Sequence, residues 1–129
     1  MAMRLDLLYE GPMRRIEKPW GYEIIWAETE RYVGKILHID AGKKLSRQYH
    51  NAKDETFLVQ RGQMQLEIGR GGEQKTLVLC EMDRYHCPPK TIHRMIALTD
   101  VDVLEVSTPE LDDVVRIDDD YGRAERHGD

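Results

Sequence analysis

Hydrophobic residues along this chain form short stretches that are separated by turn-forming residues. The clearest stretch is residues 63–68, where polar and apolar residues alternate without a break. Met64, Leu66 and Ile68 are therefore expected to face one interior of a β-sheet. The Gly-rich residues 69–73 that follow are typical of a hairpin turn. This alternation predicts an all-β chain.

About nine stretches of this kind are predicted to be strands. They are residues 22–26, 32–39, 45–50, 55–60, 63–68, 74–79, 85–88, 93–98 and 101–107. Helical periodicity occurs only weakly, at residues 4–9. Short strands at near-regular spacing, without a linker or a repeat, predict one sandwich, jelly-roll or barrel domain. We expect a single domain over residues 1–129, with its core at about residues 18–108 and a charged tail at 109–129.

Composition and charge narrow the function classes. With 129 residues, 40% of them hydrophobic and 33% charged, the chain has the composition of a soluble globule. The net charge of −5 and the lack of a basic stripe argue against nucleic acid as a partner, although a small anionic ligand remains open. No apolar run is long enough to span a membrane, and the start lacks the features of a signal peptide. The expected location is cytoplasmic.

Both cysteines are interpreted as structural thiols. Cys80 and Cys87 do not form a CxxC pair, and both flank or lie in predicted strands. A free cysteine is commonly a small buried hydrophobe, and this usage fits a reducing compartment.

Four residues have the spacing of a metal site. Gln48 and His50 are two apart on a predicted strand, so their side chains leave it by the same face. Glu55 opens the next strand after a four-residue connection, and His93 follows the Pro-rich residues 88–92. Two imidazoles, a carboxylate and an amide oxygen suit a divalent transition metal and leave room for water or substrate. Each residue alone would more often be a surface or hydrogen-bonded group, but the combined spacing favours ligation.

This arrangement, with Gly42 and Gly62 on either side of the first three residues, resembles the metal motifs of the cupins. The resemblance implies a double-stranded β-helix, which is a jelly-roll barrel. In cupins the first motif supplies two histidines and a glutamate, and Gln48 stands at one of these histidine positions.

One cupin branch shares this glutamine. The sequence Leu-Ser-Arg-Gln-Tyr-His at residues 45–50 is similar to a Leu-Ser-Leu-Gln-x-His run in the isomerase domain of type II phosphomannose isomerases. In many members this domain is fused to a guanylyltransferase, and we do not expect nucleotide-sugar synthesis from these 129 residues, which resemble the isomerase domain. Other shared landmarks are Lys-Pro-Trp-Gly at 18–21, Lys35 in the second predicted strand, His-Arg at 93–94, Asp-Asp-Val-Val-Arg at 112–116 and Asp-Tyr-Gly-Arg at 120–123, and several of these lie outside the metal motif.

The resemblance implies aldose–ketose isomerisation of a sugar phosphate, with one divalent ion per chain (Zn, Mn, Ni or Fe). It also implies a homodimer. Lys35 and Glu105 lie on predicted strands with inward-facing neighbours, so they are candidates for the general base. Arg116 matches the closing motif and is the candidate hydrogen-bond donor to the phosphate group of the substrate. His86 is a candidate substrate contact. For each of these the alternative is a solvated charge, an ion pair or a packed histidine.

Three function classes remain open. They are a sugar or sugar-phosphate isomerase or epimerase, another cupin enzyme such as an iron dioxygenase or a lyase, and a non-enzymatic cupin that binds a small molecule. Several departures from the branch weaken any inference about the substrate. Arg47 replaces an apolar residue, Met82 and Lys90 replace glycines, and Ala97 replaces an asparagine.

Overall fold

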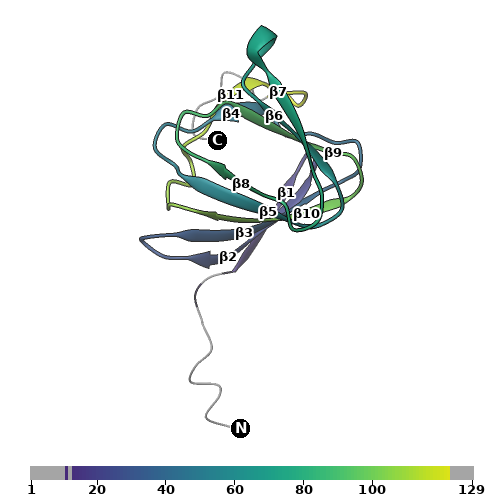
Figure 1. The fold of residues 1–129 in the computed structure, drawn as a ribbon. Coiled ribbons are helices and arrows are strands. Elements are labelled where there is room, and N and C mark those ends of the chain that lie inside the picture. Colours follow the sequence, from purple (N-terminus) through teal and green to yellow (C-terminus); the bar gives the residue numbers. More distant parts are fainter. Residues whose placement is uncertain (1–10, 12, 123–129) are drawn as a thin grey trace.

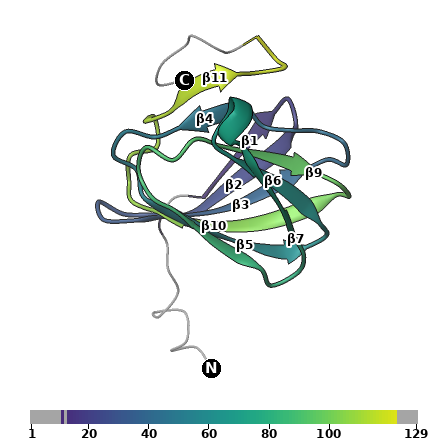
Figure 2. The ribbon, with the colours of Figure 1, turned by 45° about the horizontal axis from the view of Figure 1, so that its top comes forward.

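Two antiparallel β-sheets face each other in the computed structural model, which describes residue 11 and residues 13–122 (Figures 1 and 2). The first sheet has the order β1 (Arg14–Lys18), β2 (Gly21–Glu28), β3 (Val33–Ile39), β10 (Val101–Ser107), β5 (Glu55–Arg61) and β8 (Arg84–Cys87). The second has the order β11 (Val115–Asp118), β4 (Arg47–Tyr49), β9 (His93–Ala97), β6 (Met64–Ile68) and β7 (Lys75–Leu79). The all-β prediction is confirmed, and a short 3-10 turn at Gly71–Glu73 occupies the predicted hairpin connection. Among the described residues there is no helix able to span a membrane.

The inward-facing side chains between the two sheets change from apolar to polar along a strand. On β10, Val101 and Val103 face inward first, and Glu105 and Ser107 follow at the same two-residue spacing, all of them buried. The register places Glu105 opposite Lys35 of β3, while the two valines lie opposite apolar residues of that strand. The pleat therefore directs polar side chains to one end of the barrel and apolar ones to the other.

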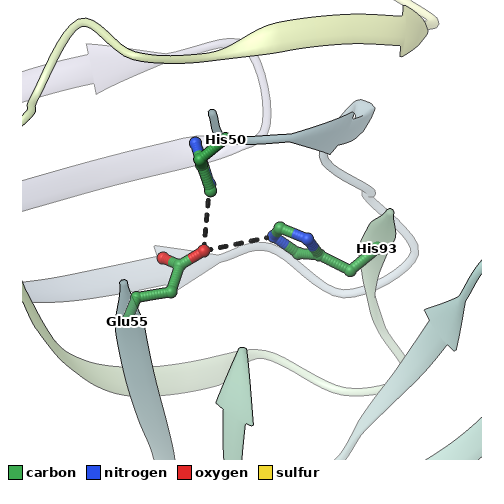
Figure 3. A group of neighbouring side chains, drawn as sticks. All are labelled: His50, Glu55 and His93. Carbon is green, nitrogen blue, oxygen red and sulfur yellow. Dashed lines mark ion pairs between the residues drawn. The ribbon is translucent and has the colours of Figure 1, made fainter. Parts of the chain in front are cut away.

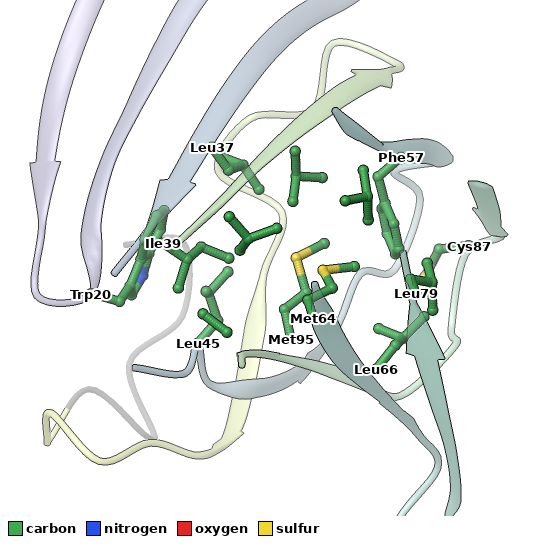
Figure 4. Packing of buried hydrophobic residues seen from close by; sticks show 14 residues of the cluster. Trp20, Leu37, Ile39, Leu45, Phe57, Met64, Leu66, Leu79, Cys87 and Met95 are labelled. Carbon is green, nitrogen blue, oxygen red and sulfur yellow. The ribbon is translucent and has the colours of Figure 1, made fainter. Parts of the chain in front are cut away.

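The apolar end is a single cluster of buried side chains from both sheets (Figure 4). Met64 and Leu66 are fully buried there, as the alternation predicted, and Ile68 packs against the cluster while remaining partly exposed. Phe57 and Met95 are also members, and they lie one alternation step from the polar residues of their own strands. This core fixes the strands that carry the polar end.

Two strands were missing from the sequence-based expectation. β1 lies at residues that were assigned to no element, and β11 lies in the charged tail. An ion pair ties β11 to β4: the buried Arg47 side chain contacts Asp118 at 2.9 Å, and it also contacts Glu67 of β6 at 2.8 Å. Strands held in this way leave little hydrophobic pattern to find. The weak helical signal at residues 4–9 lies outside the described residues.

Gly62 provides a test of backbone constraint. Its φ is +90°, and an added Cβ would lie 2.2 Å from the carbonyl oxygen of Asp100. We expect Gly62→Ala to lower the free energy of unfolding by about 1–3 kcal/mol, measured by urea denaturation. Gly72→Ala is the matched control, because no atom lies within 4 Å of its added Cβ. Equal stabilities of the two variants would contradict the constraint.

Candidate metal and ligand site

The polar end of the barrel contains a cavity of about 100 Å³. Both sheets line it, and so does the connection between β10 and β11. Its charged and metal-ligating lining residues are Lys18, Glu23, Lys35, Gln48, His50, Lys53, Glu55, His93, Glu105 and Arg116. Every predicted site residue except His86 is in this set.

Three buried side chains converge at the centre of the site (Figure 3). The Nε2 atom of His50 lies 2.9 Å from Oε2 of Glu55, and Nε2 of His93 lies 3.3 Å from the same oxygen. His50 directly follows β4, Glu55 opens β5 and His93 opens β9, and each of the three is at most 5% exposed. Their potential ligand atoms all lie within 4.8 Å of one another.

Backbone carbonyl groups orient both imidazoles. Nδ1 of His50 lies 2.6 Å from the carbonyl oxygen of Asp113, and Nδ1 of His93 lies 2.9 Å from that of Thr91. Because a carbonyl can only accept, each Nδ1–H donates, and each Nε2 is left facing Glu55. A neutral imidazole and a carboxylate present only lone pairs to each other, so a proton or a metal ion is needed between them.

The unsatisfied atoms of this group fit a cation. Nε2 of His50 and Oε2 of Glu55 are both buried, and within the described part of the chain neither has a hydrogen-bond partner of suitable geometry. Buried polar atoms of this kind need a partner, and imidazole nitrogens with a carboxylate oxygen are ligands for a divalent transition metal. The group therefore has the composition and orientation of a metal site.

Asp113 organises the connection between β4 and β5. Its carboxylate accepts hydrogen bonds from the backbone N–H groups of Asn51, Ala52 and Lys53 at 3.0, 2.7 and 3.0 Å. Burial alone would raise the pKa of Asp113, but these three donors hold it below its usual value. One residue thus orients His50 through its carbonyl oxygen and shapes the connection through its side chain.

The same connection turns Lys53 into the cavity. This lysine is only 5% exposed, and its Nζ lies 3.1 Å from Oε2 of Glu105 and 3.4 Å from Oε1 of Glu55. Burial opposes its charge, but the two carboxylates outweigh burial and raise the pKa of Lys53 above its ordinary value. Sequence reasoning missed Lys53, because a lysine in a short connection is normally solvated.

The two buried carboxyl groups have pKa values that are moved in opposite directions. Burial raises the pKa of Glu55, but contacts with the two imidazoles and with Lys53 outweigh it and hold this pKa well below its usual value. Burial also raises the pKa of Glu105, and the negative charge of Glu55 adds to this effect against the attraction of nearby lysines. The pKa of Glu105 consequently lies above its ordinary value. One carboxylate is kept ionised while the other is more easily protonated.

His93 holds a proton strongly when no cation is bound. Burial alone would lower its pKa, but contacts with Cys87 and Glu55 outweigh burial and raise the pKa of His93 to about 10. Sγ of Cys87 lies 3.3 Å from Nδ1 of His93, and this thiol is itself 1% exposed. Its buried, core position agrees with a structural role for Cys87.

The other predicted residues occupy different positions around this centre. Gln48 lies opposite His93 in the β4–β9 pair, and its Oε1 accepts a hydrogen bond of 2.7 Å from Ser46. Arg116 lies opposite Gln48 in the β11–β4 pair, so these three residues form one row across the second sheet. Lys35 lies in the cavity wall, 3.5 Å from Glu23.

His86 is separate from the cavity. Its side chain is 60% exposed, and its Nε2 lies 2.7 Å from Asp54. The geometry gives no support to the predicted substrate contact. Arg47 and Arg94 also lie outside the cavity lining.

Comparison with known proteins agrees with this geometry. The family described as mannose-6-phosphate isomerase C-terminal matches residues 10–119. The chain is 35% identical to the mannose-1-phosphate guanylyltransferase ManC of Salmonella typhimurium over 128 residues, which cover 94% of this chain and 26% of that protein. It is 30% identical to the xanthan biosynthesis protein XanB of Xanthomonas campestris, with 85% and 24% covered. The chain thus spans about a quarter of the length of these curated relatives.

Solved structures show the same fold. KdgF from a Halomonas species superposes with a TM-score of 0.63 at 24% identity, covering 78% of this chain and 89% of that one. The oxalate decarboxylase of Bacillus subtilis, described with Mn(II) centres, superposes with a TM-score of 0.63 at 17% identity, covering 75% and 27%. The match over residues 10–119 and the two-sheet barrel lead to one conclusion: the chain belongs to the mannose-6-phosphate isomerase C-terminal family and has the cupin double-stranded β-helix fold.

Proposed function

We propose that the cavity holds one divalent metal ion through Gln48, His50, Glu55 and His93 and interconverts the aldose and ketose forms of a sugar phosphate. The observation that carries this proposal is the pair of buried imidazoles whose Nε2 atoms both face Oε2 of Glu55. Zn, Mn, Ni and Fe all accept such a set of donors, so the donor set leaves the ion open. When bound, the ion supplies a Lewis acid that polarises the substrate oxygens.

The protein must also move a proton between neighbouring carbon atoms. In this reaction a base removes the proton beside the carbonyl carbon, and the same group returns it to the former carbonyl carbon. Glu105 is suited to this role, because its pKa is raised while Glu55 stays ionised. Lys53 contacts Glu105 directly, and Lys35 lies opposite it across β3 and β10. The positive charges of these two lysines lower the pKa of Glu105 and so oppose the effect of burial on it.

The charge of the cavity supports an anionic substrate. Its lining has four cationic side chains, Lys18, Lys35, Lys53 and Arg116, against the three carboxylates of Glu23, Glu55 and Glu105. A divalent ion would add two further positive charges. Arg116 offers guanidinium donors from the wall formed by β11, and such donors match phosphate oxygens well.

Metal content tests the ligand set. We expect about one equivalent of a divalent ion in the purified chain after reconstitution, and none in His50→Ala or His93→Ala, because each removes one of two imidazole ligands. Mass spectrometry measures the metal content per chain, and circular dichroism checks that each variant is folded. His86→Ala is the control, since this exposed histidine lies outside the cavity. A full equivalent in either ligand variant would rule out this assignment.

Metal affinity is expected to rise with pH. In the metal-free chain the pKa of His93 is about 10, so at neutral pH a proton occupies the imidazole that the metal must use. Binding then releases this proton, and below that pKa each unit of pH should change the dissociation constant of Zn²⁺ about tenfold. Calorimetric titration at several pH values, in buffers of different ionisation enthalpy, measures both effects. A pH-independent dissociation constant would contradict the expected proton release.

Turnover tests the proposed reaction. We expect the metal-loaded chain to convert mannose 6-phosphate to fructose 6-phosphate in a coupled assay. Glu105→Gln should lower kcat by roughly 100-fold or more while retaining the metal, because it removes the proton carrier. Glu73→Gln is the control, since Glu73 is exposed in the turn before β7.

The other function classes have distinct outcomes in the same experiment. Saturable binding of the sugar phosphate by metal-loaded protein, without turnover, would replace the isomerase with a binding module. Oxygen uptake by the Fe(II)-loaded chain, without isomerisation, would indicate a different cupin enzyme.

A further inference from the structure

Glu23 and Lys35 form a buried ion pair in the wall of the cavity. Glu23 lies on β2 and Lys35 on β3, each side chain is 10% exposed, and Oε2 of Glu23 lies 3.5 Å from Nζ of Lys35. The next inward positions of the same strands are the buried Ile25 and Leu37, so alternation places both charges in rows that are otherwise apolar. Two apolar side chains at such positions are often at least as stable as a buried ion pair. Stability alone therefore does not explain this pair, and buried charges in a cavity are candidates for chemistry.

The pair adjoins Glu105 in the same cavity. Lys35 lies opposite Glu105 in the β3–β10 pair, and β2, which carries Glu23, is the next strand of the sheet. Lys35 is close enough to Glu105 for its charge to lower the pKa of that carboxyl group. With about 4.8 Å between neighbouring strands, Glu23 is roughly 10 Å from Glu105 along the sheet. A sugar whose reacting carbon atoms lie at Glu105 therefore has its neighbouring oxygen atoms beside this pair.

A sugar phosphate needs a second proton transfer before it can be isomerised. A hexose 6-phosphate in water is almost entirely cyclic, with its anomeric carbon bonded both to a hydroxyl group and to the ring oxygen. The open-chain carbonyl compound forms only when the hydroxyl loses its proton and the ring oxygen gains one. Because both oxygens are bonded to the same carbon, this step is best served by a proton acceptor and a proton donor that lie side by side.

The other titratable side chains of the cavity already have roles. The imidazoles and Glu55 form the proposed metal centre, and Glu105 carries the proton that moves between carbon atoms. Two carboxylates raise the pKa of Lys53, so this lysine keeps its proton, and the guanidinium of Arg116 does not lose one. Among the described residues that line the cavity, Glu23 is the one carboxylate that the proposed reaction does not use.

The spacing of the pair leaves both groups available to a substrate. An ordinary N–H···O hydrogen bond has a length of about 2.7–3.2 Å, and the contact between Glu23 and Lys35 is longer, at 3.5 Å. Each group can therefore form a hydrogen bond with a bound oxygen atom without breaking a tight one. The two groups are also close enough for a proton to pass between them with a small movement of either side chain.

We propose that Glu23 and Lys35 open and close the ring of the bound sugar phosphate. The Glu23 carboxylate takes the proton of the anomeric hydroxyl, and the Lys35 ammonium gives a proton to the ring oxygen. The bond between the anomeric carbon and the ring oxygen breaks with its electron pair on that oxygen, while the electron pair of the O–H bond completes the carbonyl group. The proton on Glu23 then passes to Lys35, so the pair is restored and no other reactant is consumed.

This inference rests on the proposed function for the class of substrate, but it adds an activity, the interconversion of the two anomers. The test uses 2-deoxyglucose 6-phosphate, which has no hydroxyl at carbon 2 and so cannot become a ketose. Exchange spectroscopy by nuclear magnetic resonance measures how fast its anomers interconvert. We expect the metal-reconstituted chain to exceed the rate in buffer, and Glu23→Gln to lower that excess roughly 100-fold.

A matched control and a binding measurement separate proton transfer from a structural role. Glu17→Gln is the control, because Glu17 lies on the neighbouring strand β1 with its side chain 73% exposed, and anomer exchange should be unchanged. Calorimetry should show that Glu23→Gln changes the dissociation constant of 2-deoxyglucose 6-phosphate by less than about threefold, since glutamine keeps the shape of the side chain. A large loss of binding would instead give Glu23 a purely structural or binding role and overturn the proposal.

The outcomes distinguish this inference from the proposed isomerase. Anomer exchange that depends on Glu23, without turnover of mannose 6-phosphate, would support the ring-opening pair and reject the isomerase. Turnover of mannose 6-phosphate with anomer exchange that Glu23→Gln leaves intact would support the isomerase and overturn the ring-opening pair. Anomer exchange no faster than in buffer would overturn it as well.

Discussion

Most of the polar side chains inside the barrel are arranged around the buried carboxylate of Glu55. A carboxylate removed from water costs several kcal/mol unless other groups compensate its charge. Here two imidazoles face one of its oxygens and Lys53 faces the other. The carbonyl oxygens that orient the imidazoles, and the Asp113 side chain that shapes the β4–β5 connection, are needed because this compensation works only at short distance.

The barrel separates this polar centre from its hydrophobic core by using the two-residue period of its strands. On β9, His93 faces the cavity, and Met95 and Ala97 follow on the same face in the core. On β5, Glu55 is followed in the same way by Phe57 and Val59. On each of these strands the candidate ligand is therefore only two residues from the first side chain of the core. The rigid packing of the core thus restricts the positions of the ligating side chains.

The same period explains how much was predictable. Strand alternation and a short connection placed Gln48, His50 and Glu55 near one another, since these restrict where a side chain can point, and the resemblance to the cupin motifs added His93 to the same cavity. Lys53 and Asp113 did not follow, because their roles depend on the conformation of a connection and on contacts more than fifty residues apart in the chain. β11 was also missed, since it is held by buried arginines rather than by an apolar pattern.

The cavity wall formed by β11 should respond to salt concentration more strongly than the other walls do. Besides its backbone pairing with β4, this strand is tied by ion pairs of Arg47 with Asp118 and, just beyond the strand, of Arg94 with Asp120, and each aspartate side chain is at least half exposed. Dissolved ions screen such pairs, whereas the apolar core is indifferent to them at moderate ionic strength. A rise in salt concentration should therefore weaken the side-chain ties of the strand that carries Arg116 more than it weakens the packing of the core, while the backbone pairing of β11 with β4 is unaffected.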